Sequence, residues 1–365
     1  GLLALGTLLV VSVFLVVPER FLAHYSLREF TLEERLLTQG RILWDYLGQL
    51  MWPQTARMGL YHDDVLLSHS LTNPVATLHA LLAWGGVLVA AAVSSGFVLG
   101  RRVTFCMLFY LVGHSVESTV LPLELYFEHR NYFPGIAVFL LAALLLAELQ
   151  QRWRRVAAPV MAYLALGLVV LSFNTSSQVE IWSNSYLLRF NQINAHPTSF
   201  RANADMAVMS ARAGSLERAL EYSARAHEHT RERAGDHYMR NLALSCIADQ
   251  PLAATQAPNR QALVAERPLS SVPTLHTLVK MLQNDECRHL DRSALADTFA
   301  AVYLRPKAEA TASGNIYALL AVLENALGRY SNAYEYTARF LAESPQATRG
   351  LLMQLHFSTA LGKVE

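Results

Sequence analysis

Apolar residues are distributed unevenly along this chain of 365 residues. Long uncharged runs fill residues 1–173, whereas residues 174–365 read as an ordinary water-soluble helical sequence rich in Ala, Arg, Glu and Ser. A helix that crosses a membrane needs roughly 20 apolar residues, with about 17 as the lower end. The sequence therefore predicts an all-α protein whose first part is a polytopic membrane domain over residues 1–173. Its predicted spans are residues 1–17, 75–99, 103–121, 133–149 and 157–173.

Positive charge on short loops predicts how these spans are oriented. Arg101 and Arg102 lie between the second and third spans, and the basic segment 151–155 (QRWRR) lies between the fourth and fifth. Such loops remain in the cytoplasm. The loops 18–74 and 122–132, and everything after residue 173, are then predicted to face outward. In a bacterium this is an inner-membrane protein with a periplasmic C-terminal domain; in a eukaryote that domain is lumenal.

The start of the chain affects what can be assigned. The apolar run begins at Gly1 without a preceding basic segment and ends at Pro18-Glu19-Arg20 rather than at a small-residue cleavage site. This pattern favours a membrane helix over a signal peptide. We expect the chain to be truncated within or before a membrane helix.

The polar half contains an internal repeat. A shift of 114 residues aligns two segments that begin at Phe200 and Gly314. Large and small residues on a first helix, Gly at a turn and small residues on a second helix are typical of tetratricopeptide (TPR) repeats. We therefore predict a linker over residues 174–197 and a TPR-like α-solenoid over 198–365, with degenerate helical pairs over 235–312. The aligned positions are Met206, Ala207, Gly214, Ala219 and Ala226 in the first segment and Tyr317, Leu320, Ala321, Gly328, Ala333, Phe340 and Pro345 in the second.

Composition indicates which classes of partner the protein can bind. The chain is 53% hydrophobic and 16% charged, with a net charge of +1, and no segment combines clustered Lys and Arg with aromatic residues. These features exclude a nucleic-acid partner. The concave face of a TPR-like solenoid usually binds a peptide or protein, although such an array can also be a scaffold without a binding role. Membrane lipid is the other expected partner.

The chain has three cysteines. Cys106 lies within a predicted span and is interpreted as a small buried apolar residue. Cys246 and Cys287 fall in the outward domain, where an oxidising compartment would allow a disulfide between them. The sequence does not indicate whether the two residues are close.

The long outward loop over residues 18–74 carries the first candidate chemistry. Its segment 38–52 has apolar residues at helical spacing and two tryptophans, which predicts a helix lying in the membrane interface and ending at Pro53. Further along, His62, Asp63 and Asp64 stand together. They favour acid–base chemistry or a divalent cation that holds a phosphate; the alternative is a solvated turn.

A denser group of polar residues stands between the third and fourth predicted spans. His114 and Glu117 share one helix face and could pair with each other, but they supply too few ligands for a metal site, so no metal is assigned. Charged residues near bilayer depth are usually functional. The segment before the fourth span is therefore the candidate substrate site, although an interfacial anchor or an Arg–Glu clasp between loops would have the same sequence. Its residues are Glu128, His129, Arg130, Asn131 and Tyr132.

These features together resemble the GT-C-type membrane glycosyltransferases with C-terminal TPR repeats, in particular the transmembrane-and-TPR protein O-mannosyltransferases and their bacterial relatives. The resemblance covers nearly the whole chain, but its motifs are short, and the EHRNYFP element is the most specific. It rests on residues 41–53 (RILWDYLGQLMWP), His62-Asp63-Asp64, residues 128–134 (EHRNYFP) and Trp182 in VEIWSN.

The resemblance implies a reaction and a donor. Such enzymes move a sugar from a polyprenyl or dolichyl phosphate to an acceptor, often a protein hydroxyl, on the outward face. Their catalytic base lies in an earlier outward loop, so the resemblance places it upstream of Gly1 and assigns no base in this chain. Arg130, together with His129, would steady the lipid phosphate that leaves.

Two other functions remain open. The first is a non-catalytic, membrane-anchored TPR scaffold for envelope or pilus assembly, in which Glu128 and Arg130 have no role in catalysis. The second is an oligosaccharide ligase of the O-antigen type, which would have a larger outward loop than residues 122–132.

Overall fold

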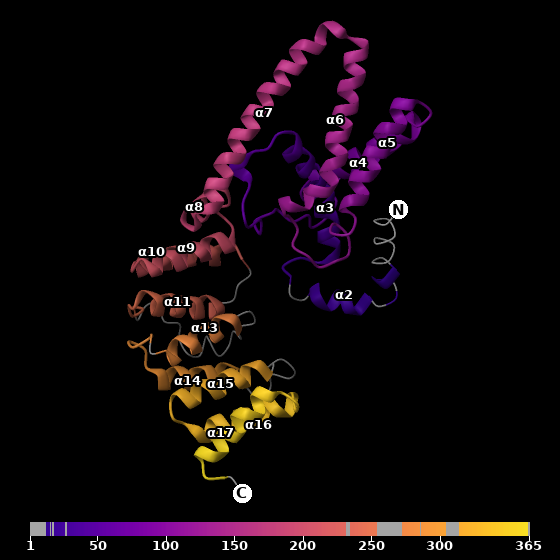
Figure 1. Ribbon diagram of the computed structural model, residues 1–365. Coiled ribbons are helices and arrows are strands. Elements are labelled where there is room, and N and C mark those ends of the chain that lie inside the picture. The colour runs from indigo at the N-terminus through magenta and orange to yellow at the C-terminus, as the bar shows by residue number, and fades with distance from the viewer. Residues whose placement is uncertain are drawn as a thin grey trace. The chain divides into compact units, whose positions relative to one another are not determined.

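The computed structural model of the chain describes residues 12–14, 16, 18–25, 28–230, 234–253, 272–284, 286–303 and 314–363. These residues form helices and connecting loops, with no strand among them, so the all-α prediction is confirmed. The chain divides into two compact units, Gly1–Ala202 and Asn203–Glu365. Figure 1 shows the helices of both units.

Three helical stretches of the first unit are long and apolar enough to cross a membrane: Ala76–Ser94, Glu128–Arg152 and Ala158–Ser183. They overlap the spans predicted over residues 75–99, 133–149 and 157–173. Figure 1 shows α6 and α7 as a long helical hairpin. The stretches correspond to α4 (Ala76–Ser94), to the 3-10 helix η2 (Glu128–Asn131) with α6 (Tyr132–Arg152), and to most of α7 (Arg154–Ser183).

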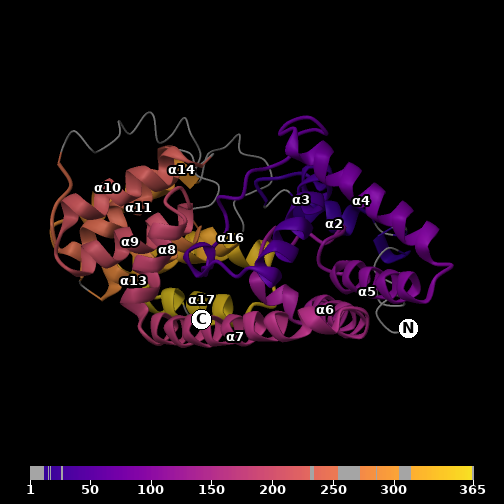
Figure 2. The same ribbon diagram turned by 90° about the horizontal axis from the view of Figure 1, so that it is seen from above.

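The span predicted over residues 103–121 differs in the structure. Helix α5 covers Val98–His114, only 17 residues, and the chain turns directly after it. The N–H groups of Glu117 and Ser118 both donate to the carbonyl oxygen of His114. Residues 115–127 form a loop instead, and Figure 2 shows α5 running back beside α4. Most of the predicted span over residues 1–17 lies outside the described residues.

The segment predicted as a linker is largely helical. Helix α7 continues to Ser183, and α8 covers Ser185–Ala195. Asn184 separates the two helices and caps α8, because its side chain accepts hydrogen bonds from the N–H groups of Tyr186 and Leu187. No Gly or Pro occurs between residues 174 and 196, so nothing in the sequence interrupts the helices except this cap.

Helix α3 (Leu32–Met51) organises the first unit. Its first turn has a capping box, in which Thr31 and Glu34 bind each other's backbone N–H groups, and it ends two residues before Pro53. The helix therefore includes the segment predicted to be helical, residues 38–52. Its buried face is polar, however, which differs from an interfacial helix whose apolar face alone is covered.

Three polar side chains on this face of α3, Arg35, Gln39 and Tyr46, bind the backbone of the loop over residues 115–127. Burial lowers the pKa of Arg35 to about 10, which leaves its guanidinium charged at neutral pH. Buried polar groups need such partners, so these bonds hold the loop against the helix. Arg35 donates to the carbonyl oxygens of Glu117, Thr119 and Leu123, Gln39 donates to that of Leu125, and the Tyr46 hydroxyl accepts from the Phe127 N–H.

Helix α3 also packs against α4. The rings of Trp44 and Trp84 stack with their centroids 4.3 Å apart. Each indole N–H donates to a carbonyl of the opposite helix, Trp44 to Ala80 and Trp84 to Gly40. The absence of a side chain at Gly40 permits this close approach, since a Cβ atom there would lie 2.8 Å from Leu81.

The second unit is a series of antiparallel helices. Figure 1 shows them following one another in chain order as a stack. Its largest apolar core gathers residues from α11, α13, α14 and α15, and a disulfide joins Cys246 to Cys287 beside this core. The helices are α9 (Phe200–Arg212), which begins in the first unit, α10 (Leu216–Glu228), α11 (Ala234–Ala248), α13 (Val272–Gln283), α14 (Arg292–Tyr303), α15 (Gly314–Ala326), α16 (Tyr330–Glu343) and α17 (Thr348–Ala360).

Candidate functional site

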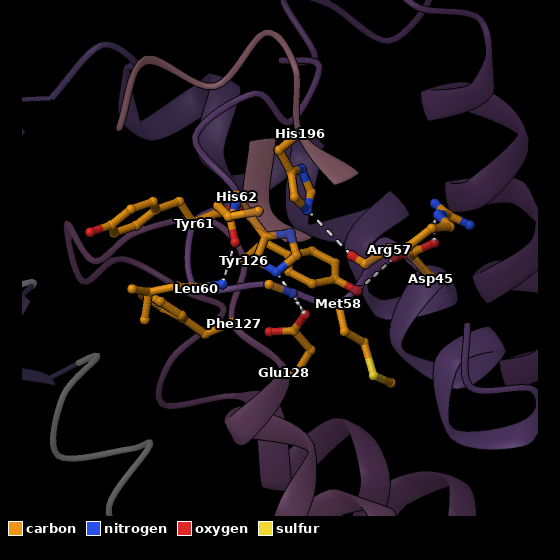
Figure 3. A network of polar contacts seen from close by, with 12 residues as sticks. Asp45, Arg57, Met58, Leu60, Tyr61, His62, Tyr126, Phe127, Glu128 and His196 are labelled. Atoms are coloured by element: carbon orange, nitrogen blue, oxygen red, sulfur yellow. Dashed lines mark hydrogen bonds and ion pairs between the residues drawn. The ribbon is translucent and has the colours of Figure 1, made fainter. Parts of the chain in front are cut away.

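A hydrogen bond joins the two motifs of the first unit that the sequence singled out. His62 Nε2 lies 2.7 Å from Glu128 Oε1, although the residues are 66 positions apart. The same carboxylate oxygen accepts from the Gly59 N–H at 3.2 Å. Figure 3 shows Glu128 beneath the His62 ring. The Glu128 carboxylate thus holds the His62 imidazole in a fixed orientation, as the third group does for the base of a nucleophile–base pair.

Helix α8 fixes the loop that carries His62. The Gln192 side chain, whose residue is 3% exposed, accepts from the Leu60 N–H at 2.6 Å and donates to the Tyr61 carbonyl at 2.7 Å. The loop passes so close to α8 that a Cβ atom at Gly59 would lie 2.2 Å from the Gln192 oxygen. A side chain at position 59 would therefore displace the Gln192 amide from its present position.

Asp64 and His196 form a second carboxylate–imidazole pair. His196 Nδ1 lies 2.9 Å from Asp64 Oδ1, and His196 Nε2 lies 3.3 Å from the Arg57 carbonyl oxygen. Burial disfavours the charged imidazolium, but the hydrogen bond to Asp64 and its charge outweigh burial and raise the pKa of His196. Burial likewise favours the neutral acid of Asp64, but the contact with His196 lowers its pKa. Both effects favour the ion pair.

A third group surrounds the Tyr126 hydroxyl. It donates to Asp45 Oδ2 at 2.7 Å, and the other oxygen of Asp45 lies 3.4 Å from Arg57 Nη2. The Tyr126 ring lies against the His62 ring, with centroids 4.5 Å apart. Burial, followed by the hydrogen bond to Asp45, raises the pKa of Tyr126, so the phenol remains a donor. Figure 3 shows these side chains converging.

Residues from each of the three groups line one depression, which we call the polar cleft. Its volume is about 390 Å³, within the range of roughly 300–1,000 Å³ that is usual for small-molecule sites. The cleft contains two guanidinium groups, two carboxylates and two imidazoles. Its lining residues are Arg41, Ile42, Asp45, Gln49, Arg57, His62, Asp64, Val65, Leu66, Tyr126, Ala195 and His196.

Arg41 and Arg57 have guanidinium N–H donors that remain available in the cleft. Arg41 Nη2 donates to the Leu66 carbonyl oxygen, and its Nε has no hydrogen-bond partner among the residues that the structure describes, although it is buried. The Arg57 side chain is 58% exposed and its contact with Asp45 is long for a hydrogen bond. A guanidinium carries five N–H donors, so both residues can bind an additional anion.

The residues predicted as a substrate site before α6 do not come together in the structure. Arg130 is buried, with its Nε 2.9 Å from Glu117 Oε2 and its Nη1 2.8 Å from the Glu124 carbonyl oxygen. These contacts are those of the Arg–Glu clasp that was the structural alternative, and Arg130 is not among the residues that line the polar cleft. Asn131 is buried, whereas His129 and Tyr132 are exposed. Glu128 of this segment binds His62, which lines the cleft.

The second set of predicted residues is also divided. His62 and Asp64 line the cleft, whereas Asp63 accepts hydrogen bonds from the Ser199 hydroxyl and the Arg201 N–H at the start of α9. Asp63 and Asp64 form a turn in which Asp63 is exposed, as in the alternative for this segment, but both side chains also make hydrogen bonds. The pairing proposed between His114 and Glu117 is not formed: the His114 ring lies between those of Tyr46 and Tyr110.

Sequence reasoning did not assign roles to Asp45, Arg57, Tyr126 and His196. Asp45 lies within the segment 41–53 that carried the resemblance, so its signal was present in the motif. His196 stands directly before Pro197, at a break between helices, and only the folded chain brings it to Asp64. No group of three His, Cys, Asp or Glu side chains within the described part of the chain is arranged to hold a metal ion.

Comparison with known proteins adds no assignment, because no family model, no curated protein and no solved structure matches the chain.

Proposed function

We propose that this chain is part of a membrane glycosyltransferase, which moves a sugar from a polyprenyl-phosphate donor to a hydroxyl of a protein or glycan acceptor. The hydrogen bond between His62 and Glu128 at the polar cleft carries the proposal. It joins two of the motifs on which the resemblance to GT-C-type enzymes rests. The cleft beside it also has the size and the charged groups that a phosphorylated sugar requires.

Arg41 and Arg57 are the proposed phosphate ligands. Guanidinium groups match the geometry of phosphate oxygens and form charge-assisted hydrogen bonds with them. Arg41 has a buried Nε without a partner among the described residues, and Arg57 is held only by a long contact with Asp45. This assignment replaces Arg130 as the donor ligand, because the Arg130 guanidinium is already bound by Glu117 and backbone carbonyls.

His62 is the proposed proton acceptor within this chain, a role that the resemblance instead places upstream of Gly1. In the reaction, the acceptor oxygen forms a bond to the anomeric carbon, the bond from that carbon to the phosphate oxygen breaks, and the acceptor proton moves to the base. Glu128 binds one ring nitrogen of His62 and would stabilise the imidazolium that forms. The polyprenyl phosphate leaves as an anion, which Arg41 and Arg57 would stabilise.

The membrane location of the reaction follows from the three apolar helices that are long enough to span a bilayer. A polyprenyl chain requires a membrane, and η2, which carries Glu128, directly precedes α6. We propose that the cleft faces the periplasm of a bacterial inner membrane, because the basic residues Arg101, Arg102 and Arg152 lie at the opposite ends of the apolar helices in sequence.

The second unit is the proposed acceptor-binding part, as a TPR-like solenoid. Its two aligned turn glycines, Gly214 and Gly328, both adopt positive φ angles, +79° and +70°, which glycine adopts without strain. The aligned alanines Ala219 and Ala333 are fully buried, as expected where two helices cross closely. These features support the repeat and, with it, a surface that binds peptides.

A transfer assay tests the proposal. Membranes from cells that express the protein are incubated with a radiolabelled polyprenyl-phosphate hexose, and the label that enters protein or glycan is measured. Replacing a general base usually lowers the rate by about 10²- to 10⁴-fold, so we expect His62→Gln to reduce transfer by at least about 100-fold.

The chain offers a matched control. His69 also binds a glutamate, with Nδ1 2.6 Å from Glu34 Oε1, but neither residue lines the cleft. We expect His69→Gln to transfer sugar at the wild-type rate. Equal rates for His62→Gln and wild type would overturn the assignment of His62, and the absence of transfer in every sample would favour the non-catalytic scaffold, for which the clasp between Arg130 and Glu117 is the favouring observation.

A further inference from the structure

Helix α8 has an inverted distribution of polar and apolar residues. Its exposed side carries Tyr186, Leu187 and Phe190, which are 63%, 43% and 50% exposed. Its buried side carries Gln192, which binds the loop over residues 59–61. A helix on the surface of a water-soluble protein has its apolar side buried and its polar side exposed. The exposed side of α8 therefore favours an apolar environment over water.

Helix α8 directly follows a helix that is long and apolar enough to cross a membrane. Only Asn184 separates it from Ser183, where the stretch Ala158–Ser183 ends. Trp182, at this end of α7, is 52% exposed. Tryptophan and tyrosine are enriched at the boundary between the hydrocarbon and the water, where the ring is apolar and its polar group reaches the headgroups.

We infer that α8 lies in the membrane interface, with the Tyr186, Leu187 and Phe190 side chains inserted between the lipid headgroups and the acyl chains. The lipid surface is the partner that fits, because α8 contains no acidic residue and directly follows α7, the helix that contains a candidate span. An interfacial helix inserts its apolar side about 5–10 Å into this boundary. The opposite side of α8 then holds the loop that carries His62.

This placement of α8 determines how far the polar cleft lies from the membrane. Ala195 and His196, at the C-terminal end of α8, line the cleft, and a helix of 11 residues extends only about 16 Å. The cleft is therefore placed next to the bilayer surface, within reach of a lipid headgroup. The inference does not depend on sugar transfer, because it rests on the side chains of α8 and on the apolar helix that precedes it.

Fluorescence quenching tests the inference. Phe190→Cys and Tyr186→Cys are prepared separately in the full chain, labelled with the environment-sensitive dye NBD and reconstituted into phosphatidylcholine–phosphatidylglycerol vesicles. Cys106 is buried, and Cys246 and Cys287 are joined by a disulfide, so the introduced thiol is the reactive one. We expect blue-shifted NBD emission that lipids with a nitroxide at a shallow acyl position quench more strongly than lipids with a deep nitroxide.

Two control positions calibrate the measurement. Val169→Cys, in the middle of the apolar stretch of α7, should be quenched most by the deep nitroxide. Glu228→Cys, at the exposed end of α10, should be quenched by iodide in the water and not by the lipids. Iodide quenching at both α8 positions would overturn the inference in favour of a water-exposed helix. Protection from both iodide and lipid would overturn it in favour of a protein partner.

Discussion

Arg130 and Arg57 differ in the partners that the folded chain gives them. Both are arginines near polar motifs, but Arg130 is surrounded by Glu117 and two backbone carbonyls, whereas Arg57 has one long contact with Asp45. Sequence alone favoured Arg130, because it stands in the most specific motif. The number of guanidinium N–H donors that remain without a protein acceptor depends on the path of the loop over residues 115–127. No local sequence pattern specifies that path.

His62 differs from Arg130, because the structure places it in the lining of the polar cleft. Its segment carried acid–base chemistry as one interpretation and a solvated turn as the other. The structure buries the His62 side chain against Glu128 and Tyr126. The residue types were sufficient to select the candidate, but its partner could be found only from the fold, because the pair is separated by 66 positions.

The ion pair between Asp64 and His196 predicts a pH dependence at the residue scale. The pKa of His196 is raised in the folded chain, so its stabilising effect is complete below the unfolded pKa of about 6.5 and disappears as the pH rises through the folded value. The pKa of Asp64 is lowered, so its contribution is lost only in acid. We expect the thermal unfolding midpoint of the detergent-solubilised chain to fall as the pH rises from about 6.5 through the folded pKa of His196.

His196→Gln is the variant for that experiment, with His69→Gln as the control. Removing a charge-assisted hydrogen bond costs about 1–3 kcal/mol, and the difference from wild type should appear at low pH and diminish at high pH. The other titratable groups near His196, His62 and Glu128, remain in both proteins. The same pH profile for His196→Gln and wild type would contradict the assigned ion pair.

At the scale of elements, α3 shows what hydrophobic periodicity can and cannot predict. The apolar spacing and the two tryptophans of residues 38–52 predicted a helix, and a helix covers them. The covered face could not be predicted, because Arg35, Gln39 and Tyr46 are polar and are covered in part by the loop that they bind. The same loop shortens α5 relative to the span predicted over residues 103–121.

Arg35 should therefore be important for the order of the loop. Arg35→Met leaves the carbonyl oxygens of Glu117, Thr119 and Leu123 without their donor, and each unsatisfied buried group costs about 1–3 kcal/mol. We expect a total loss of more than about 3 kcal/mol and faster amide hydrogen exchange over residues 115–127.

Arg28→Met provides the comparison for Arg35→Met. Arg28 donates to a single carbonyl of the same loop, that of Pro122, at 2.8 Å, so its removal should cost only about 1 kcal/mol. Equal exchange rates for the two variants would show that the contacts of Arg35 do not hold the loop.

At the scale of the whole molecule, composition predicted the division into an apolar first part and a polar second part. The structure separates two units after Ala202, and three apolar helices of the first unit can span a membrane. The helical character of residues 174–195 was not predicted, because their low apolar content resembles that of a linker. Asn184 is the only interruption between α7 and α8, and α8 connects α7 to Ala195 and His196 at the polar cleft.

Binding of a lipid phosphate is the most direct measurement of what the cleft does. Equilibrium binding of a short-chain polyprenyl phosphate, and of the same polyprenol without phosphate, is measured on the chain in nanodiscs. If Arg41 and Arg57 hold the phosphate, wild type should bind the phosphate form at least about 10-fold more tightly, or about 1.4 kcal/mol. The variant with both Arg41→Gln and Arg57→Gln should lose that preference, whereas Arg225→Gln, on the exposed surface of α10, should keep it. Equal affinity of the wild-type chain for the phosphate and the alcohol would contradict a phosphate-binding cleft.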